Sequence, residues 1–302
     1  MVALNFKKVT LQKKATIIAS ATSFALVIIK VIIGIISGSV AVLASAIDSI
    51  LDLVISMFNF FAVTKSEEEA NQKFNYGKGK IEALAAVIEG TIIIMSGLYI
   101  FYMAIEKAIN EKTTQYLDIS IVVMLISIAI TAILVLFLNH VAKKTNSLVI
   151  KSDALHYKTD LFTNAAIIFS LVAVKFSGFE IIDSIVGSII AVYIIYSAYM
   201  IIKEGVYMLL DGSLDQEMVQ KIEDAIKNTK GVTDYHFLKT RRSGKVNFVD
   251  VHLVFHPEIL LIDAHEIGDR VEEKIHEIDK TSEWVINIHL DPYDDSGLHD
   301  KK

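Results

Sequence analysis

The chain has 302 residues, of which 53% are hydrophobic and 21% are charged, and its formal net charge is −6. This hydrophobic share exceeds the roughly 45–50% that is usual in soluble domains, which indicates a membrane protein. The lack of cysteine excludes disulfides, thiolate metal sites and cysteine nucleophiles, and the acidic net charge gives no basic surface for nucleic acid.

Six apolar stretches are each long enough to cross a bilayer as a helix, which takes roughly 20 apolar residues. They are Ala15–Ile36, Val40–Val63, Ile81–Ile109, Leu117–His140, Asp153–Phe176 and Ile181–Leu209. The first follows a basic segment, as in a signal peptide. Its apolar run exceeds the roughly 7–15 residues of such a signal, so we expect a retained helix.

The lysines predict the orientation of these spans. Eleven lysines lie before the first span or in the second and fourth connections, namely Lys7, Lys8, Lys13, Lys14, Lys65, Lys73, Lys78, Lys80, Lys143, Lys144 and Lys151. The other side of the membrane has only Lys107, Lys112 and Lys175. Because lysine is enriched in cytoplasmic connections, we expect both termini in the cytoplasm.

The second and fifth spans each carry a pair of ionisable residues four positions apart. Asp48 and Asp52 share one helix face, and so do His156 and Asp160. A charge at the centre of a span costs about 2.5–3.5 kcal/mol, so these residues indicate a functional site. Three carboxylates and one imidazole suit tetrahedral Zn²⁺. Without the metal the carboxylates must hold protons, which predicts competition between metal and protons.

Other polar residues in the spans have less specific interpretations. We expect Asp153 to cap the fifth span, because aspartate is a favoured N-cap residue. Asn59, Glu89 and Asn164 are as consistent with hydrogen bonds between helices as with a functional role.

From Asp211 onward the composition is that of a soluble domain, which predicts a boundary between residues 1–210 and 211–302. The pattern there is helix, two strands, helix and strand, an αββαβ arrangement typical of an α+β domain. Strand alternation places His252, His289 and Asp291 away from the core. With His236 and His265 they predict a second metal site, although single surface histidines commonly have no function.

The motifs "SAIDSILD" and "SDALHYKTD", with six spans and a small αββαβ domain, resemble the cation diffusion facilitator family. Within this family the chain looks like the bacterial zinc and ferrous-iron efflux members, and the resemblance covers nearly the whole chain. It implies a homodimeric metal/proton antiporter with Asp48, Asp52, His156 and Asp160 as its transport site. Manganese-type members tend to carry aspartate in place of His156, so the histidine favours zinc-like metals.

The resemblance also implies residues outside the spans. A metallochaperone-like cytoplasmic domain would hold two metal ions near the dimer interface, with ligands His236, His252, His265, His289 and Asp291. An ion pair between protomers would correspond to Lys80 and Asp211. The chain departs from the family in "FNYGKGK", where Phe74 and Lys78 replace two histidines of an additional metal site. We predict that this third site is absent.

Together these patterns predict a membrane all-α domain with six transmembrane helices and a cytoplasmic α+β domain in the cell inner (plasma) membrane. The expected function is proton-coupled efflux of Zn²⁺, or of Fe²⁺, Cd²⁺ or Co²⁺, by alternating access. The expected partners are a second copy of the chain, lipid, divalent metal ions and protons, with no organic cofactor and no enzyme activity.

Two alternatives stay open. A membrane-bound metalloenzyme would need an open ligand position and a nearby general base. A membrane-anchored metal sensor would leave the carboxylates within the membrane unexplained.

Overall fold

The computed structural model describes residues 10–37, 40–110, 118–177, 181–280 and 282–294. The chain divides into two compact units, Met1–Val206 and Tyr207–Lys302. Three lysines used above for the orientation lie outside the described residues, namely Lys7, Lys8 and Lys112.

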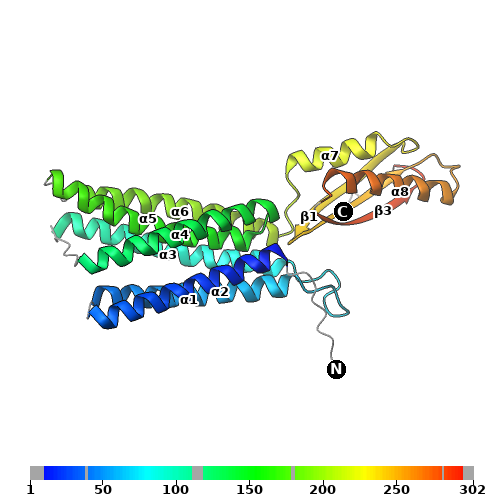
Figure 1. Cartoon of the computed structure of the whole chain (residues 1–302). Helices are drawn as coiled ribbons and strands as arrows, with labels where there is room; N and C mark the ends of the chain where they lie inside the picture. The colour runs from blue at the N-terminus through cyan, green and yellow to red at the C-terminus, as the bar shows by residue number, and fades with distance from the viewer. Residues whose placement is uncertain (1–9, 38–39, 111–117, 178–180, 281, 295–302) are drawn as a thin grey trace, which may run out of the picture. The chain divides into compact units, whose positions relative to one another are not determined.

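The first unit is built from long helices, as predicted (Figure 1). They are α1 (Leu11–Ser37), α2 (Val40–Ser66), α3 (Lys80–Asn110), α4 (Asp118–Thr145), α5 (Leu148–Ser177) and α6 (Ile181–Leu209). Among the described residues, α1, α2, α3, α4 and α6 each contain a stretch long and apolar enough to cross a membrane.

Helix α5 has 30 residues and carries Lys151, Asp153, Lys158 and Asp160 in its first half. Such a helix crosses a membrane only where neighbouring helices or water cover its polar groups. Helix α5 packs against α4 and α3, which supply part of that cover.

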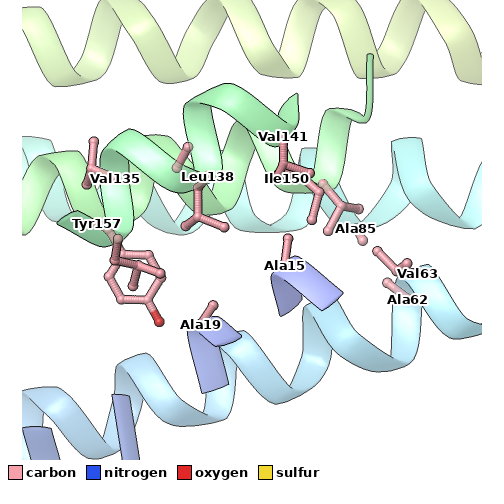
Figure 2. Close-up of a cluster of buried hydrophobic side chains, with 13 residues drawn as sticks. Ala15, Ala19, Ala62, Val63, Ala85, Val135, Leu138, Val141, Ile150 and Tyr157 are labelled. Atoms are coloured by element: carbon pink, nitrogen blue, oxygen red, sulfur yellow. The ribbon is translucent and has the colours of Figure 1, made fainter. Parts of the chain in front are cut away.

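The core of the helical unit contains many small residues. Ala15 and Ala19 of α1 and Ala62 of α2 are buried beside Leu138 of α4 and Tyr157 of α5 (Figure 2). Small residues allow helix backbones to approach closely, which is the usual means of packing inside a bilayer. This packing fixes α5 against α1 and α2, the helices that face its polar residues.

The second unit has the predicted αββαβ order. Its elements are α7 (Gln216–Lys227), β1 (Asp234–Ser243), β2 (Val246–Val254), α8 (Leu261–Ile278) and β3 (Glu283–Asp291). Strand β2 is central, antiparallel to β1 and parallel to β3. Strand β2 buries Val249, Val251 and Leu253 among Ile222 of α7 and Val271 of α8. The opposite face of β2 therefore carries the alternate side chains, which include His252.

Candidate metal centres

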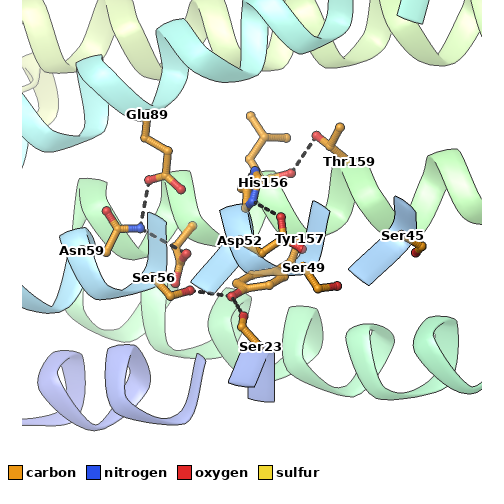
Figure 3. A network of polar contacts seen from close by, with 12 residues as sticks. Ser23, Ser45, Ser49, Asp52, Ser56, Asn59, Glu89, His156, Tyr157 and Thr159 are labelled. Carbon is orange, nitrogen blue, oxygen red and sulfur yellow. Dashed lines mark hydrogen bonds and ion pairs between the residues drawn. The ribbon is translucent and has the colours of Figure 1, made fainter. Parts of the chain in front are cut away.

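Among the described residues of the helical unit, one group of potential metal ligands is formed by Asp52 of α2 and by His156 and Asp160 of α5. One ligand atom from each of these residues lies within 4.8 Å of the others. His156 Nε2 lies 3.2 Å from Asp52 Oδ1, and Figure 3 shows the two side chains facing each other. Both side chains are largely buried. Two carboxylates and an imidazole are a nitrogen and oxygen ligand set of the kind that binds Zn²⁺ and similar ions.

Asp48, the fourth predicted ligand, lies one helical turn before Asp52, and its side chain is exposed. It is not part of the group made by Asp52, His156 and Asp160. The structure therefore brings together three of the four predicted transport ligands. The participation of Asp48 stays a prediction. It is based on the four ligands of a tetrahedral Zn²⁺ site, of which the group supplies three.

A second polar cluster joins α2, α3 and α5. Asn59 Nδ2 donates hydrogen bonds to Glu89 Oε2 at 3.2 Å and to Asp153 Oδ1 at 3.1 Å. All three side chains are buried, and Figure 3 shows Asn59 turned toward Glu89. Asn59 and Glu89 thus make the interhelical bond that was one of their two expected roles. The predicted capping role of Asp153 is wrong, because α5 begins at Leu148 and places Asp153 in its second turn.

Tyr157 connects three helices next to the candidate ligands. Its hydroxyl lies 2.5 Å from both Ser23 Oγ of α1 and Ser56 Oγ of α2 (Figure 3). Because Tyr157 is fully buried and follows His156 in sequence, these bonds fix the orientation of α5 where it carries the imidazole.

Sequence reasoning missed Lys30, which lies inside the first apolar stretch. Its Nζ donates to Ser49 Oγ at 2.8 Å and to the carbonyl oxygen of Ser45 at 3.3 Å. The side chain is only 8% exposed. A lysine within a span is as costly as an aspartate, so the cost that indicates a functional role for Asp48 and Asp52 also indicates one for Lys30.

Charged contacts organise the connection between α2 and α3. Lys65 Nζ lies 2.5 Å from Glu68 Oε1, and Lys78 contacts the other carboxylate oxygen. The hydrogen bonds from Lys65 and Lys78 lower the pKa of Glu68 to about 2, so this carboxylate is ionised at neutral pH. Lys78 Nζ also lies 4.9 Å from the centre of the Phe74 ring. Phe74 and Lys78 are thus engaged with each other, and the absence of a third metal site stays a prediction.

In the second unit, three histidines form a row across the sheet. His236 of β1 is paired in register with His252 of β2, and His252 with His289 of β3. The centres of neighbouring rings are 5.1 and 4.5 Å apart. We refer to these three residues as the histidine row.

Asp291, at the end of β3, contacts every member of the histidine row. Its Oδ2 lies 3.2 Å from His236 Nε2 and 2.8 Å from His252 Nδ1. Its Oδ1 lies 2.5 Å from His289 Nδ1. This buried carboxylate among imidazoles fits a transition-metal site, because imidazole and carboxylate are both common ligands of such ions.

A β-bulge sets the position of His236. The register of β1 on β2 shifts between His236 and Lys239, and Phe237 has a φ of 51°. Left-handed backbone is unusual for a large aromatic residue, and bulges commonly redirect a side chain. Asp294, which follows β3 and was not predicted, lies 3.3 Å from His236 Nδ1 and adds a second carboxylate.

The remaining predicted residues lie apart from these groups. His265 of α8 has a 69% exposed side chain and lies 3.9 Å from Asp269, so a single chain does not bring it into the histidine row. Asp211, in the second unit, accepts a hydrogen bond from Arg241 Nη1 at 3.3 Å. Lys80 belongs to the first unit, and its predicted pairing with Asp211 stays a prediction.

Both units match models of known protein families. The cation efflux transmembrane domain matches residues 16–210, and the cytoplasmic domain of the cation efflux protein matches residues 214–293. Between them the two matches cover every predicted metal ligand, and Asp294 lies one residue beyond the second match.

Curated proteins are similar over almost the full length. The chain is 34% identical over 282 residues to the cation-efflux pump FieF of Klebsiella pneumoniae and to that of Salmonella newport, and each comparison covers 93% of both chains. Among solved structures, the cadmium form of a variant MamM C-terminal domain is 19% identical. That comparison covers 26% of this chain and 98% of the other, with a TM-score of 0.25.

Proposed function

The chain belongs to the cation diffusion facilitator family of cation efflux transporters, and from this premise we propose that it exports Zn²⁺ in exchange for protons. It is a multi-pass membrane transporter and not an enzyme. We place it in the plasma membrane (the inner membrane of its cell) as a homodimer, with both termini in the cytoplasm. Fe²⁺, Cd²⁺ and Co²⁺ are the alternatives to Zn²⁺ that the same ligands admit.

The proximity of Asp52, His156 and Asp160 within the helical unit carries this proposal. In a low-dielectric environment their charges require compensation by a divalent ion or by protons. Asp48, one turn away on α2, would complete a tetrahedral set. Because metal and protons then compete for the same atoms, loading by one drives release of the other.

Alternating access would convert this competition into transport. A metal ion bound from the cytoplasm separates His156 from Asp52 and takes the places of their protons. After the site opens to the other side, returning protons displace the metal ion. His156 Nε2 and Asp52 Oδ1 lie 3.2 Å apart, close enough to share such a proton. An imidazole suits this role because it titrates near neutral pH.

The histidine row and Asp291 would hold a regulatory metal ion rather than the transported one. His236, His252 and Asp291 already place ligand atoms within 4.8 Å of one another. Imidazole and carboxylate ligands match the same class of metal as the transport site. We propose that His265, exposed in one chain, contributes when two copies assemble, so that metal at this site stabilises the homodimer.

Flux into proteoliposomes tests the proposed transport. The purified protein is reconstituted with an imposed pH gradient, and zinc uptake is followed by an encapsulated fluorescent indicator. We expect uptake that follows the size and direction of the gradient. Zinc that moves independently of the gradient would refute proton exchange. Zinc that binds without crossing the membrane would favour a membrane-anchored sensor.

Replacing His156 with aspartate should relax the preference for zinc over manganese. The substitution exchanges a nitrogen ligand for oxygen, and carboxylates suit Mn²⁺ better than imidazole does. We expect the ratio of manganese to zinc flux to rise by about tenfold. The ratio is measured in the same proteoliposomes, with Asp250→Asn as a control, because Asp250 lies in the second unit, where its carboxylate accepts a hydrogen bond from Asn287. An unchanged ratio would exclude His156 as the selecting residue.

A further inference from the structure

The buried ammonium group of Lys30 lies beside the transport site without an assigned role. Its Nζ donates to Ser49 Oγ and to the carbonyl oxygen of Ser45, both on α2. Ser49 lies between Asp48 and Asp52 in the sequence. The side chain of Lys30 thus crosses from α1 to the part of α2 that carries the predicted ligands.

Snorkelling is the ordinary explanation for a lysine near the end of a spanning helix. In that arrangement the aliphatic stem lies along the helix and the ammonium reaches water. Lys30 does the reverse, because its side chain is 8% exposed and its ammonium turns toward α2. Its two hydrogen-bond acceptors are neutral and do not balance its charge.

The charges that do balance Lys30 belong to the predicted transport site. Asp52, Asp160 and Asp48 are the acidic groups whose charges act on its ammonium. The lysine and the three carboxylates therefore form one electrostatic unit.

We propose that Lys30 is a fixed counter-ion of the transport site, which sets its net charge so that a bound divalent ion makes the site neutral. This inference rests on the proposed transport function. With a neutral imidazole, three carboxylates, one ammonium and one divalent ion have no net charge. Without Lys30 the loaded site would keep one negative charge, which is costly in a low-dielectric interior.

The charge of Lys30 affects both binding and release of the metal ion during the transport cycle. The ammonium repels the metal ion, so it weakens binding and assists release. With Lys30 the ligand set has two negative charges, which one divalent ion neutralises and one monovalent ion does not. Lys30 thus favours divalent over monovalent cations.

Lys30→Met tests this role because it keeps the aliphatic stem and removes the charge. We expect zinc to bind more tightly, on the order of tenfold, when measured at pH 8, where protons compete least. The maximal zinc flux should fall at least about fivefold and the KM should fall with it, because release becomes slower. Loss of a ligand or of packing would weaken binding, so the sign of the change is diagnostic.

Matched variants separate charge from structure. Lys30→Arg keeps the charge and should retain the affinity and KM of the wild type within about twofold. Lys151→Met removes an exposed lysine that pairs with Glu204 and should leave zinc affinity unchanged. If Lys30→Met does not give a monodisperse dimer or monomer in detergent, Lys30→Gln replaces it with the same expected direction.

Equilibrium binding and flux are measured on the same full-length preparations. Unchanged or weaker zinc binding in the uncharged variants would overturn the counter-ion role, whatever the flux. Tighter binding in those variants would support it even if the wild type carried no proton-driven flux. Absence of proton-driven flux in the wild type would refute only the proposed transport. Zinc bound by the cytoplasmic ligands does not affect the comparison of affinities, because these ligands are the same in all variants.

Discussion

Asp52→Asn should reduce proton-driven zinc flux by on the order of 100-fold or more, the largest effect that we expect from a single substitution. The change keeps the shape of the side chain and removes its charge. Asp52 Oδ1 faces His156 Nε2 at 3.2 Å, so this carboxylate would both bind the metal and orient the imidazole beside it. An uncharged amide is a poor ligand for Zn²⁺ and does not exchange protons near neutral pH.

The measurement is zinc uptake into proteoliposomes under an imposed pH gradient, with equal amounts of folded protein. Asp250→Asn is the matched control, because it makes the same change at a carboxylate in the second unit that bonds to Asn287. The control should transport normally. Equal flux in Asp52→Asn and the wild type would mean that the transported ion binds elsewhere.

Much of this architecture could be predicted because hydropathy and strand alternation report burial directly. Long apolar runs gave the helices of the first unit, and the αββαβ order followed from the spacing of apolar residues. The start of α5 could not be predicted in this way. Its first turns carry Lys151 and Asp153, and burial of Asp153 against Asn59 depends on helices distant in sequence.

The residues of the candidate sites likewise fall into those that the sequence pattern predicts and those that it does not. The spacing of His156 and Asp160 on one helix face predicts that they act together, and alternation predicts that His252 and His289 leave the core. The alignment of His236 with His252 depends on a bulge at Phe237, which no local pattern indicates. Asp294 follows the last strand, and its contact with His236 is what indicates a role at the site.

Hydropathy does not identify Lys30 as a buried charge. A long apolar run that contains one lysine still predicts a span, so the lysine is included in it. Only the hydrogen bonds to α2 distinguish a buried ammonium from a snorkelling one. Charge balance within a membrane therefore has to be examined over all helices that face a site, including those without a recognised motif.

Asp291→Asn should weaken zinc binding at the cytoplasmic site by on the order of 100-fold while leaving the transport site able to bind and move zinc. The carboxylate of Asp291 contacts the whole histidine row, because its two oxygens approach His236, His252 and His289. Replacement by an amide keeps the packing at the end of β3 but removes the charge that binds the metal.

Zinc binding per protomer is counted by equilibrium dialysis of the full-length protein, and flux is measured on the same preparation. Asp294→Asn is the matched control, since Asp294 is half-exposed and contacts His236 at one end of the histidine row. That control should weaken binding by no more than about fivefold, because an exposed charge is well screened.

If Asp291→Asn keeps the wild-type number of bound zinc ions, the histidine row is not a metal site. If it binds fewer ions and also loses all flux at saturating zinc, the cytoplasmic metal is required for transport itself rather than for its regulation.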